Sequence, residues 1–212
     1  MGYKVINLKD IYNSIGEERT KEILKDYKCS LNEDVEYFLK EKAIEFSKQD
    51  ISRTYIVMSQ HKEDDVIVGY FAITNKVTNI KKVKLSKTKK KRLLKFAIFD
   101  KESKCYSIAL PLIGQLGKNY VNGYDKLITG DILLKLACNK IKEAQELIGG
   151  RFVFLECEDK IKLREFYEDN GLVCFRKRNL EKDERNKKLY SKKIVLTKQN
   201  DFLLYSFNFS IS

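Results

Sequence analysis

A polar loop that leads directly into a helix is the first place in this sequence where chemistry can be located. The stretch 119–130, NYVNGYDKLITG, precedes a run of apolar residues with helical spacing, and Thr129 is a suitable N-cap. The first amides of a helix have no partner within it and lie at the positive end of its dipole, so they attract anions. No GxGxxG or GxxxxGK(S/T) fingerprint is present. The loop therefore predicts a phosphate site, with an ordinary strand-to-helix connection as the alternative.

The chain has few of the residues from which metal sites and catalytic triads are built. His61 is the single histidine, and the five cysteines are far apart, with no CxxC pair. A zinc site or a Ser-His-Asp triad is therefore not expected, and we predict no metal. The odd number of cysteines indicates reduced thiols rather than a disulfide framework.

Carboxylates gather where a short apolar run, RFVFLEC, ends. Glu156, Glu158 and Asp159 follow one another there, and each could accept a proton directly or through a water molecule. For any one of them, a solvated strand end is the alternative interpretation.

Positive charge is concentrated in two segments. The chain of 212 residues has a net charge of +12, which favours anionic partners. Residues 81–95 include nine Lys or Arg and no acid, so this segment must be solvated. It is either a charged loop between strands or an arm that binds phosphates, and RNA or tRNA could contact it through Lys89, Lys90, Lys91 and Arg92. A second basic stretch occupies 176–193.

No run of 18 apolar residues is present, and the N-terminal MGYKVINLKD lacks the apolar segment of a secretory signal. We therefore expect a cytoplasmic protein with no membrane partner. Length and composition favour a single domain over residues 1–212, with a basic insertion at about 81–95.

Apolar periodicity predicts the elements that position these residues. Pro111, Gly114 and Gly117 interrupt the long strand before the loop, which predicts a bulge or bend in it. The helix after the loop leads to another apolar strand, so these two strands must run parallel. The expected helices are 34–46 (capped by Asn32), 130–147 and 160–170, and the expected strands are 54–58, 66–73, 106–116 and 151–157.

Four segments in this order, LIGQLGKNY, NGYDKLITGDILLKLACNKI, GGRFVFLECED and LREFYEDNGLVCF, resemble the core of GNAT-type N-acetyltransferases. The likeness covers about residues 106–175 and is greatest to bacterial acetyltransferase toxins and mobile-element acetyltransferases, which carry an LGxLAV strand and a C-terminal FYxxxGF. Phe166, Tyr167 and Gly171 match that last motif, and Leu172 replaces its final aromatic.

The resemblance implies an α/β fold with a mostly antiparallel twisted sheet, a splayed parallel strand pair and flanking helices. It also implies acetyl-CoA as the co-substrate, with Tyr167 protonating the departing thiolate and Glu156 as a candidate base. The family's loop reads (R/Q)xxGx(G/A), whereas here Asp125 and Ile128 stand at the Arg/Gln and Gly positions. Asn122 and Gly123 could take their place, and Lys126 could add a contact to phosphate. The implied cofactor-binding residues are Leu116, Gly117, Lys118, Asn122, Gly123, Asp125, Lys126, Thr129 and Gly130.

Three functions follow from these observations. The first is transfer of acetyl to a primary amine on a protein, a small molecule or an aminoacyl-tRNA, and the toxin-like resemblance adds an antitoxin protein as a candidate partner. The second is a non-catalytic nucleic-acid-binding protein on a GNAT-like fold, and the third is an unrelated α/β interaction protein. Binding of acetyl-CoA separates the first from the second.

Overall fold

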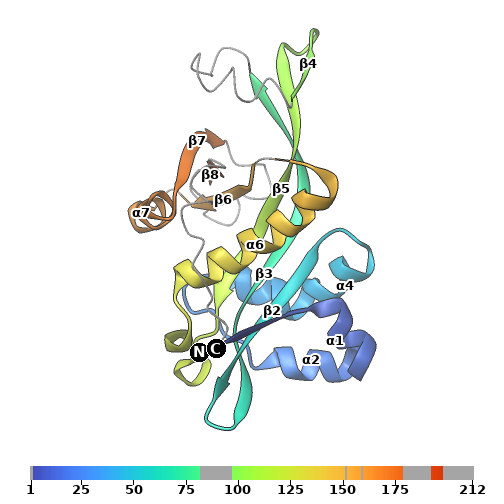
Figure 1. The fold of residues 1–212 in the computed structure, drawn as a ribbon, viewed down its shortest axis with the longest axis vertical. Coiled ribbons are helices and arrows are strands. Elements are labelled where there is room, and N and C mark those ends of the chain that lie inside the picture. Colours follow the sequence, from blue (N-terminus) through green and yellow to red (C-terminus); the bar gives the residue numbers. More distant parts are fainter. Residues whose placement is uncertain (1, 82–96, 151, 159, 179–191, 198–212) are drawn as a thin grey trace.

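The structure is a computed structural model that describes residues 2–81, 97–150, 152–158, 160–178 and 192–197 (Figure 1). Lys89, Lys90, Lys91 and Arg92, in which we expect a polyanion contact, lie outside the described residues.

The centre of the fold is an eight-stranded sheet in the order β1-β2-β3-β5-β6-β8-β7, with β4 pairing with β5. Among the described strands, β5 and β6 form a parallel pair and all other pairs are antiparallel. The mixed, mostly antiparallel sheet that we expected is therefore confirmed. The strands are β1 Tyr3–Asn7, β2 Arg53–His61, β3 Asp64–Lys81, β4 Ile98–Asp100, β5 Cys105–Lys118, β6 Phe154–Glu158, β7 Leu172–Arg178 and β8 Lys192–Thr197.

The two longest strands, β3 and β5, form a ribbon that extends well beyond the helices (Figure 1). They remain paired from Gly69↔Lys118 to Lys81↔Cys105, and β4 adds a short third strand at the far end. Pro111 lies between the part of β5 that pairs with β4 and the part that pairs with β6. Among the described residues only β3 pairs with β5 at Pro111, so the other edge is open there and the missing N–H of proline can be tolerated.

Four short helices and a π-helical turn cover one face of the sheet. Asn7 caps α1 by accepting the Lys9 N–H at 3.0 Å, and Asn32 caps α3 as expected. The predicted helix 34–46 is present as a continuous run from α3 through the π turn to α4, whereas α1 and α2 were not predicted. The elements are α1 Leu8–Ile15, α2 Glu17–Lys25, α3 Glu33–Tyr37, the π turn Phe38–Lys42 and α4 Ala43–Lys48.

This face has a continuous apolar core. Leu8, Leu24 and Leu39 from the helices pack with Ile56 of β2 and Tyr70 of β3, and each of these side chains is almost completely buried. Burial of one such side chain stabilises the fold by about 1.5–3 kcal/mol. The packing fixes the N-terminal helices on the sheet.

The long helix α6, Gly130–Ile148, crosses the opposite face (Figure 1). Leu133, Ala137 and Ile141 pack against Phe71 of β3 and Ile113 of β5. The second helix expected after the loop is α7, Ile161–Asp169, and it contributes side chains to this same core. No helix in the described ranges is both long and apolar enough to cross a membrane.

Candidate functional site

The parallel pair opens at a defined position. Leu112 pairs with Phe154 and Ile113 with Leu155, and there the ladder between β5 and β6 ends within the described residues. Both strands continue, β5 to Lys118 and β6 to Glu158. The strands we predicted to be adjacent, parallel and splayed are so arranged, although β6 begins at Phe154 rather than at residue 151.

A β-bulge lies at the start of the opening. The partner of Ala72 is Gln115 and the partner of Ile73 is Ile113, so Gly114 is the extra residue. The predicted irregularity is therefore confirmed and located at Gly114. Beyond it β5 stays paired with β3, and alternate backbone groups point to the other edge, into the opening. Leu116, Gly117 and Lys118 lie along this part of β5.

Gly117 has a packing role that the sequence did not reveal. A Cβ at this position would lie 2.5 Å from Val35 Cγ1 and 2.7 Å from the Tyr27 hydroxyl oxygen. Real Cβ atoms do not approach heavy atoms so closely, so glycine lets Tyr27 and α3 lie against β5. The splayed strand is consequently in direct contact with the N-terminal helical layer.

The loop after β5, Val121–Leu127, is a 3₁₀ segment with a kink at Asn122 and Gly123, whose backbone is not helical. Asn122 and Gly123 adopt φ of 49° and 75°, directly after residues in the right-handed region. A right-handed residue followed by a left-handed one turns successive N–H groups to one side and forms a concavity that binds anions. The two residues proposed to replace the family's loop glycine therefore have a suitable backbone.

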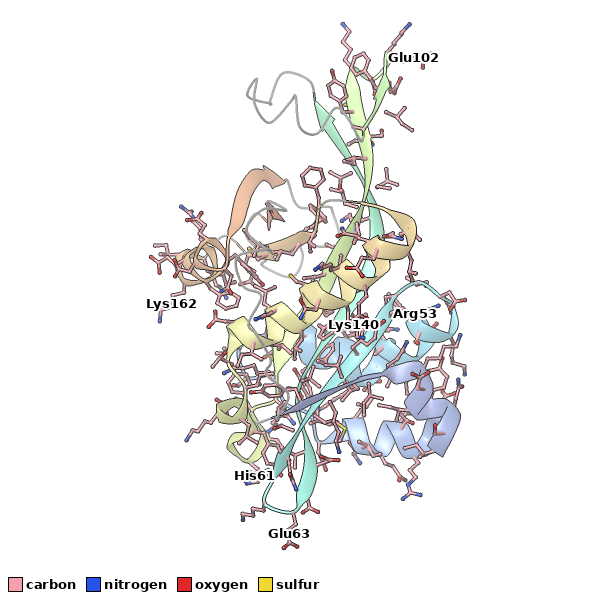
Figure 2. The ribbon with its side chains drawn as sticks, viewed as in Figure 1. Arg53, His61, Glu63, Glu102, Lys140 and Lys162 are labelled. Atoms are coloured by element: carbon pink, nitrogen blue, oxygen red, sulfur yellow. The ribbon has the colours of Figure 1, made fainter. Side chains whose placement is uncertain are left out.

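Two side chains brace this loop. Lys118 Nζ donates to the carbonyl oxygen of Asp125 at 2.9 Å, and the Tyr3 hydroxyl donates to that of Leu127 at the same distance. Asp125 thus takes part through its backbone oxygen, while Lys126 is exposed. His61, labelled in Figure 2, is the last residue of β2. Its ring packs against that of Tyr124 of the loop at a centroid distance of 5.7 Å.

The start of α6 has the cap that the sequence predicted. Thr129 Oγ1 accepts the Ile132 N–H at 3.2 Å, and the Thr129 carbonyl accepts the Leu133 N–H at 3.1 Å. The amides of Gly130 and Asp131 are left without an acceptor among the described residues. They are available to an external anion at the positive end of a 19-residue helix.

The residues of the FYxxxG motif lie against this helix start. A Cβ on Gly130 would be 2.9 Å from Phe166 Cε2, and Asn170 Nδ2 donates to Asp131 Oδ1 at 2.7 Å. These contacts fix α7 relative to the first turn of α6, although the two segments are about 40 residues apart.

Tyr167 is partly buried against the core on the α6 side of the sheet, and its ring meets that of Phe166 edge to face at 4.9 Å. Burial raises the pKa of its hydroxyl well above the usual value, and the neighbouring Cys157 and Cys138 thiols raise it further. Tyr167 therefore keeps its proton at neutral pH and can act as a donor. It cannot act as a base there.

Glu156 faces the other side of the sheet. Leu155 and Cys157 pack towards α6, and successive residues of a strand alternate between faces, so the side chain between them points towards the N-terminal helical layer. Its Oε1 lies 3.0 Å from Lys76 Nζ of β3. Its side chain is 11% exposed and that of Lys76 is 39% exposed. The structure thus places Tyr167 and the Glu156 carboxylate on opposite faces of the sheet.

Asn119, which directly follows β5, was not singled out from the sequence. The residue is 3% exposed, and its side chain bonds Lys28, 91 positions away, as well as Ile67 of β3. No local pattern identifies such a residue, because both partners are distant in sequence.

The sequence matches no protein-family model, and no curated protein matches it. Solved structures are similar. AtaT complexed with acetyl-methionyl-tRNAfMet is 16% identical with a TM-score of 0.61, covering 96% of this chain and 98% of that one. A tyrosine-to-phenylalanine mutant of KacT is 14% identical with a TM-score of 0.62, covering 96% and 99%. The chain has the GNAT fold.

A third similar structure holds both the cofactor and a partner. It is an AtaT toxin mutant bound to the C-terminus of the antitoxin AtaR and to acetyl-CoA, 16% identical with a TM-score of 0.56, covering 98% of this chain and all of that one. The GNAT fold expected from the motifs is therefore confirmed over nearly the full length, well beyond residues 106–175 that carried the resemblance. Among the described residues, no group of three His, Cys, Asp or Glu side chains could hold a metal ion.

Proposed function

We propose that this protein is an acetyl-CoA-dependent N-acetyltransferase. The observation that carries the proposal is the opening between β5 and β6, which leads to the free amides at the start of α6 with Tyr167 beside it. A long ligand with a thioester at one end and a pyrophosphate in its middle fits this arrangement. Acetyl-CoA is bound to similar proteins of the same fold.

The chain's own groups can bind each part of acetyl-CoA. Backbone groups of Leu116, Gly117 and Lys118 that point into the opening would receive the pantetheine arm and polarise the thioester carbonyl. The pyrophosphate would lie on the loop amides of Asn122 and Gly123 and on the first turn of α6, at Thr129 and Gly130. Lys126 adds positive charge there, and the Asp125 backbone keeps the loop closed through Lys118.

Two side chains would move the protons of the reaction. When the amine nitrogen attacks the acetyl carbon, the C–N bond forms and the C–S bond breaks. Tyr167 then donates its proton to the departing sulfur, a role that suits a hydroxyl held protonated by burial. Glu156, on the opposite face, would accept the proton lost by the amine, directly or through water.

The acceptor we propose is the amino group of an aminoacyl-tRNA. The net charge of +12 suits a partner with a phosphate backbone, and the similar toxin AtaT is complexed with an acetylated methionyl-tRNA. Lys89, Lys90, Lys91 and Arg92 are the residues we propose for contact with the RNA. Such a substrate is cytoplasmic, so we infer that the protein acts in the cytoplasm as a single-domain, toxin-like enzyme with a protein antitoxin as its partner.

A direct test is to incubate the protein with radiolabelled acetyl-CoA and a pool of charged tRNAs, and to follow label in the RNA and protein fractions. We expect label that is released from the RNA as an N-acetyl amino acid by mild alkaline hydrolysis. Uncharged tRNA is the matched control and should remain unlabelled.

A second candidate is a non-catalytic nucleic-acid-binding protein on the same fold. The loop that carries Asp125 and Ile128 in place of the family's Arg/Gln and Gly favours it. Calorimetric titration separates the two candidates, because the enzyme binds acetyl-CoA and a binding protein with a decayed loop does not. Absence of binding at millimolar acetyl-CoA, together with retained RNA binding, would establish the second candidate.

A further inference from the structure

Asn119, which lies between β5 and the 3₁₀ loop, makes hydrogen bonds to three parts of the fold, and the proposed reaction assigns it no role. The residue is 3% exposed, and both the oxygen and the nitrogen of its side chain have partners. Oδ1 accepts the backbone N–H of Lys28 at 3.1 Å and that of Val121 at 3.2 Å. Nδ2 donates to the carbonyl oxygen of Ile67 at 2.9 Å. One carboxamide therefore joins the N-terminal layer, the loop and β3.

Neighbouring bonds reinforce the same junction. The backbone N–H of Asn119 donates to the Val68 carbonyl at 2.8 Å, and that of Tyr120 donates to the Lys28 carbonyl at 2.8 Å. The Tyr27 hydroxyl donates to the Lys118 carbonyl at 3.1 Å. Residues 118–121 are thus held from both sides over the stretch where β5 becomes the loop.

The segment that these bonds hold, residues 27–29, is part of the N-terminal helical layer. Tyr27 and Cys29 are almost completely buried, and Cys29 N–H donates to Glu36 Oε2 of α3 at 2.9 Å. A surface groove runs along the outer side of the segment, lined by residues that include Lys28, Glu33 and Tyr37. The segment therefore connects that groove to the splayed strand.

We propose that Asn119 is a positioning residue that couples the acetyl-CoA loop to residues 27–29 on the opposite face of the sheet. This inference rests on the proposed acetyltransferase function. Asn119 touches no reacting atom. It fixes the direction of the amides before and after it, from Gly117 to Asn122, so that they meet the ligand without first being ordered. Acetyl-CoA bound to the loop consequently stabilises the segment at Lys28. Loss of the Asn119 carboxamide removes this coupling between the loop and the segment.

The test compares the wild-type protein with Asn119→Ala, and uses Ile56→Val as a matched control. Ile56 is fully buried in the core cluster that contains Tyr27 and Cys29, and its shortening reduces stability without removing a hydrogen bond. For each protein, acetyl-CoA affinity is measured by calorimetry, steady-state kinetics are recorded, and amide hydrogen exchange is followed with and without acetyl-CoA.

We expect Asn119→Ala to weaken acetyl-CoA binding by about tenfold and to raise the KM for acetyl-CoA equally, because three backbone groups lose their hydrogen bond to the carboxamide. Turnover at saturating acetyl-CoA should stay within about threefold of wild type, since the reacting groups are untouched. In the wild type, acetyl-CoA should slow exchange at the Lys28 and Val121 amides. In Asn119→Ala the protection should no longer extend to Lys28, while Ile56→Val should retain it.

Equal acetyl-CoA affinity in Asn119→Ala and wild type, or unchanged protection of Lys28, overturns the inference while leaving the proposed enzyme intact. A wild-type protein that binds no acetyl-CoA overturns both. If Asn119→Ala does not fold, Asn119→Ser provides the same comparison with a smaller polar side chain. Equal acetyl-CoA affinity or unchanged protection of Lys28 in that variant would likewise overturn the inference.

Discussion

Gly130, the first residue of α6, packs so closely against Phe166 of α7 that a Cβ on it would lie 2.9 Å from the ring. The contact joins the helix start proposed to bind pyrophosphate to the helix that carries Tyr167. A change at Gly130 therefore acts on two parts of the proposed site together.

Gly130→Val should lower the free energy of unfolding by about 1–3 kcal/mol, because the added methyl groups force the Phe166 ring to move. It should also reduce turnover, since α7 moves with the ring. Thermal melting and steady-state kinetics measure the two effects. Ile56→Val is the control, because it lowers stability by about 0.5–1.5 kcal/mol in the core of the N-terminal helical layer, away from α6 and α7. Wild-type melting and turnover in Gly130→Val would contradict this packing.

Tyr167→Phe should reduce turnover by about 10²–10⁴ while leaving acetyl-CoA affinity and melting temperature close to wild type. The substitution removes one hydroxyl and keeps the ring that packs against Phe166. Tyr124→Phe, on the loop, is the matched control and should keep its activity. Unchanged turnover in Tyr167→Phe, with acetyl transfer rate-limiting, would assign the role of acid to another group.

The pH dependence of the wild type follows from the raised pKa of Tyr167. A group with a raised pKa keeps its proton further up the pH scale, so activity that needs the protonated hydroxyl should persist to above about pH 10. Turnover measured across pH for as long as the fold persists tests this expectation. A loss of activity near about pH 8 in both wild type and Tyr167→Phe would have to come from a different group.

Glu156→Gln should reduce turnover by about 10²–10⁴ if the carboxylate accepts the amine proton. The amide has the same shape and can still accept from Lys76 Nζ, so the fold should persist. Lys76→Gln is the control, because it breaks the ion pair and leaves the carboxylate in place. We expect its turnover to stay within about tenfold of wild type. Equal losses in the two variants would indicate that the pair is structural.

Replacing Lys89, Lys90, Lys91 and Arg92 with glutamine should weaken RNA binding and flatten its dependence on salt. Each phosphate that the protein no longer neutralises lowers the slope of log K against log salt by about 0.7–0.9, so the slope should fall by up to about three. Filter binding at several salt concentrations measures it. The control replaces Lys9, Lys21, Lys25 and Lys48 of the N-terminal helices, which removes the same charge elsewhere. Identical slopes in both quadruple variants would indicate that the salt dependence of RNA binding comes from net charge alone and not from these four residues.

Local signals predicted the elements around the proposed site. The cap at Thr129, the helix that follows it and the irregular strand before it depend on residues within a few positions of one another. The parallel direction of β5 and β6 follows from the helix between them. Short elements gave weaker signals. Helices α1 and α2 have eight and nine residues and are separated only by Gly16. Such short segments contain too few turns to show the helical spacing of apolar residues clearly.

Tertiary structure alone decided the rest, because the contacts concerned join residues far apart in the chain. The opening begins after Ile113 and Leu155 since those two are the last to pair, and no local pattern sets that register. Lys76 meets Glu156 across 80 positions, and Lys28 meets Asn119 across 91. The sequence by itself determined which segments we propose to bind phosphate and to donate a proton. Only the packing of two helical layers on one sheet decided which residues hold those segments in place, because a buried polar group finds its partners through the whole fold.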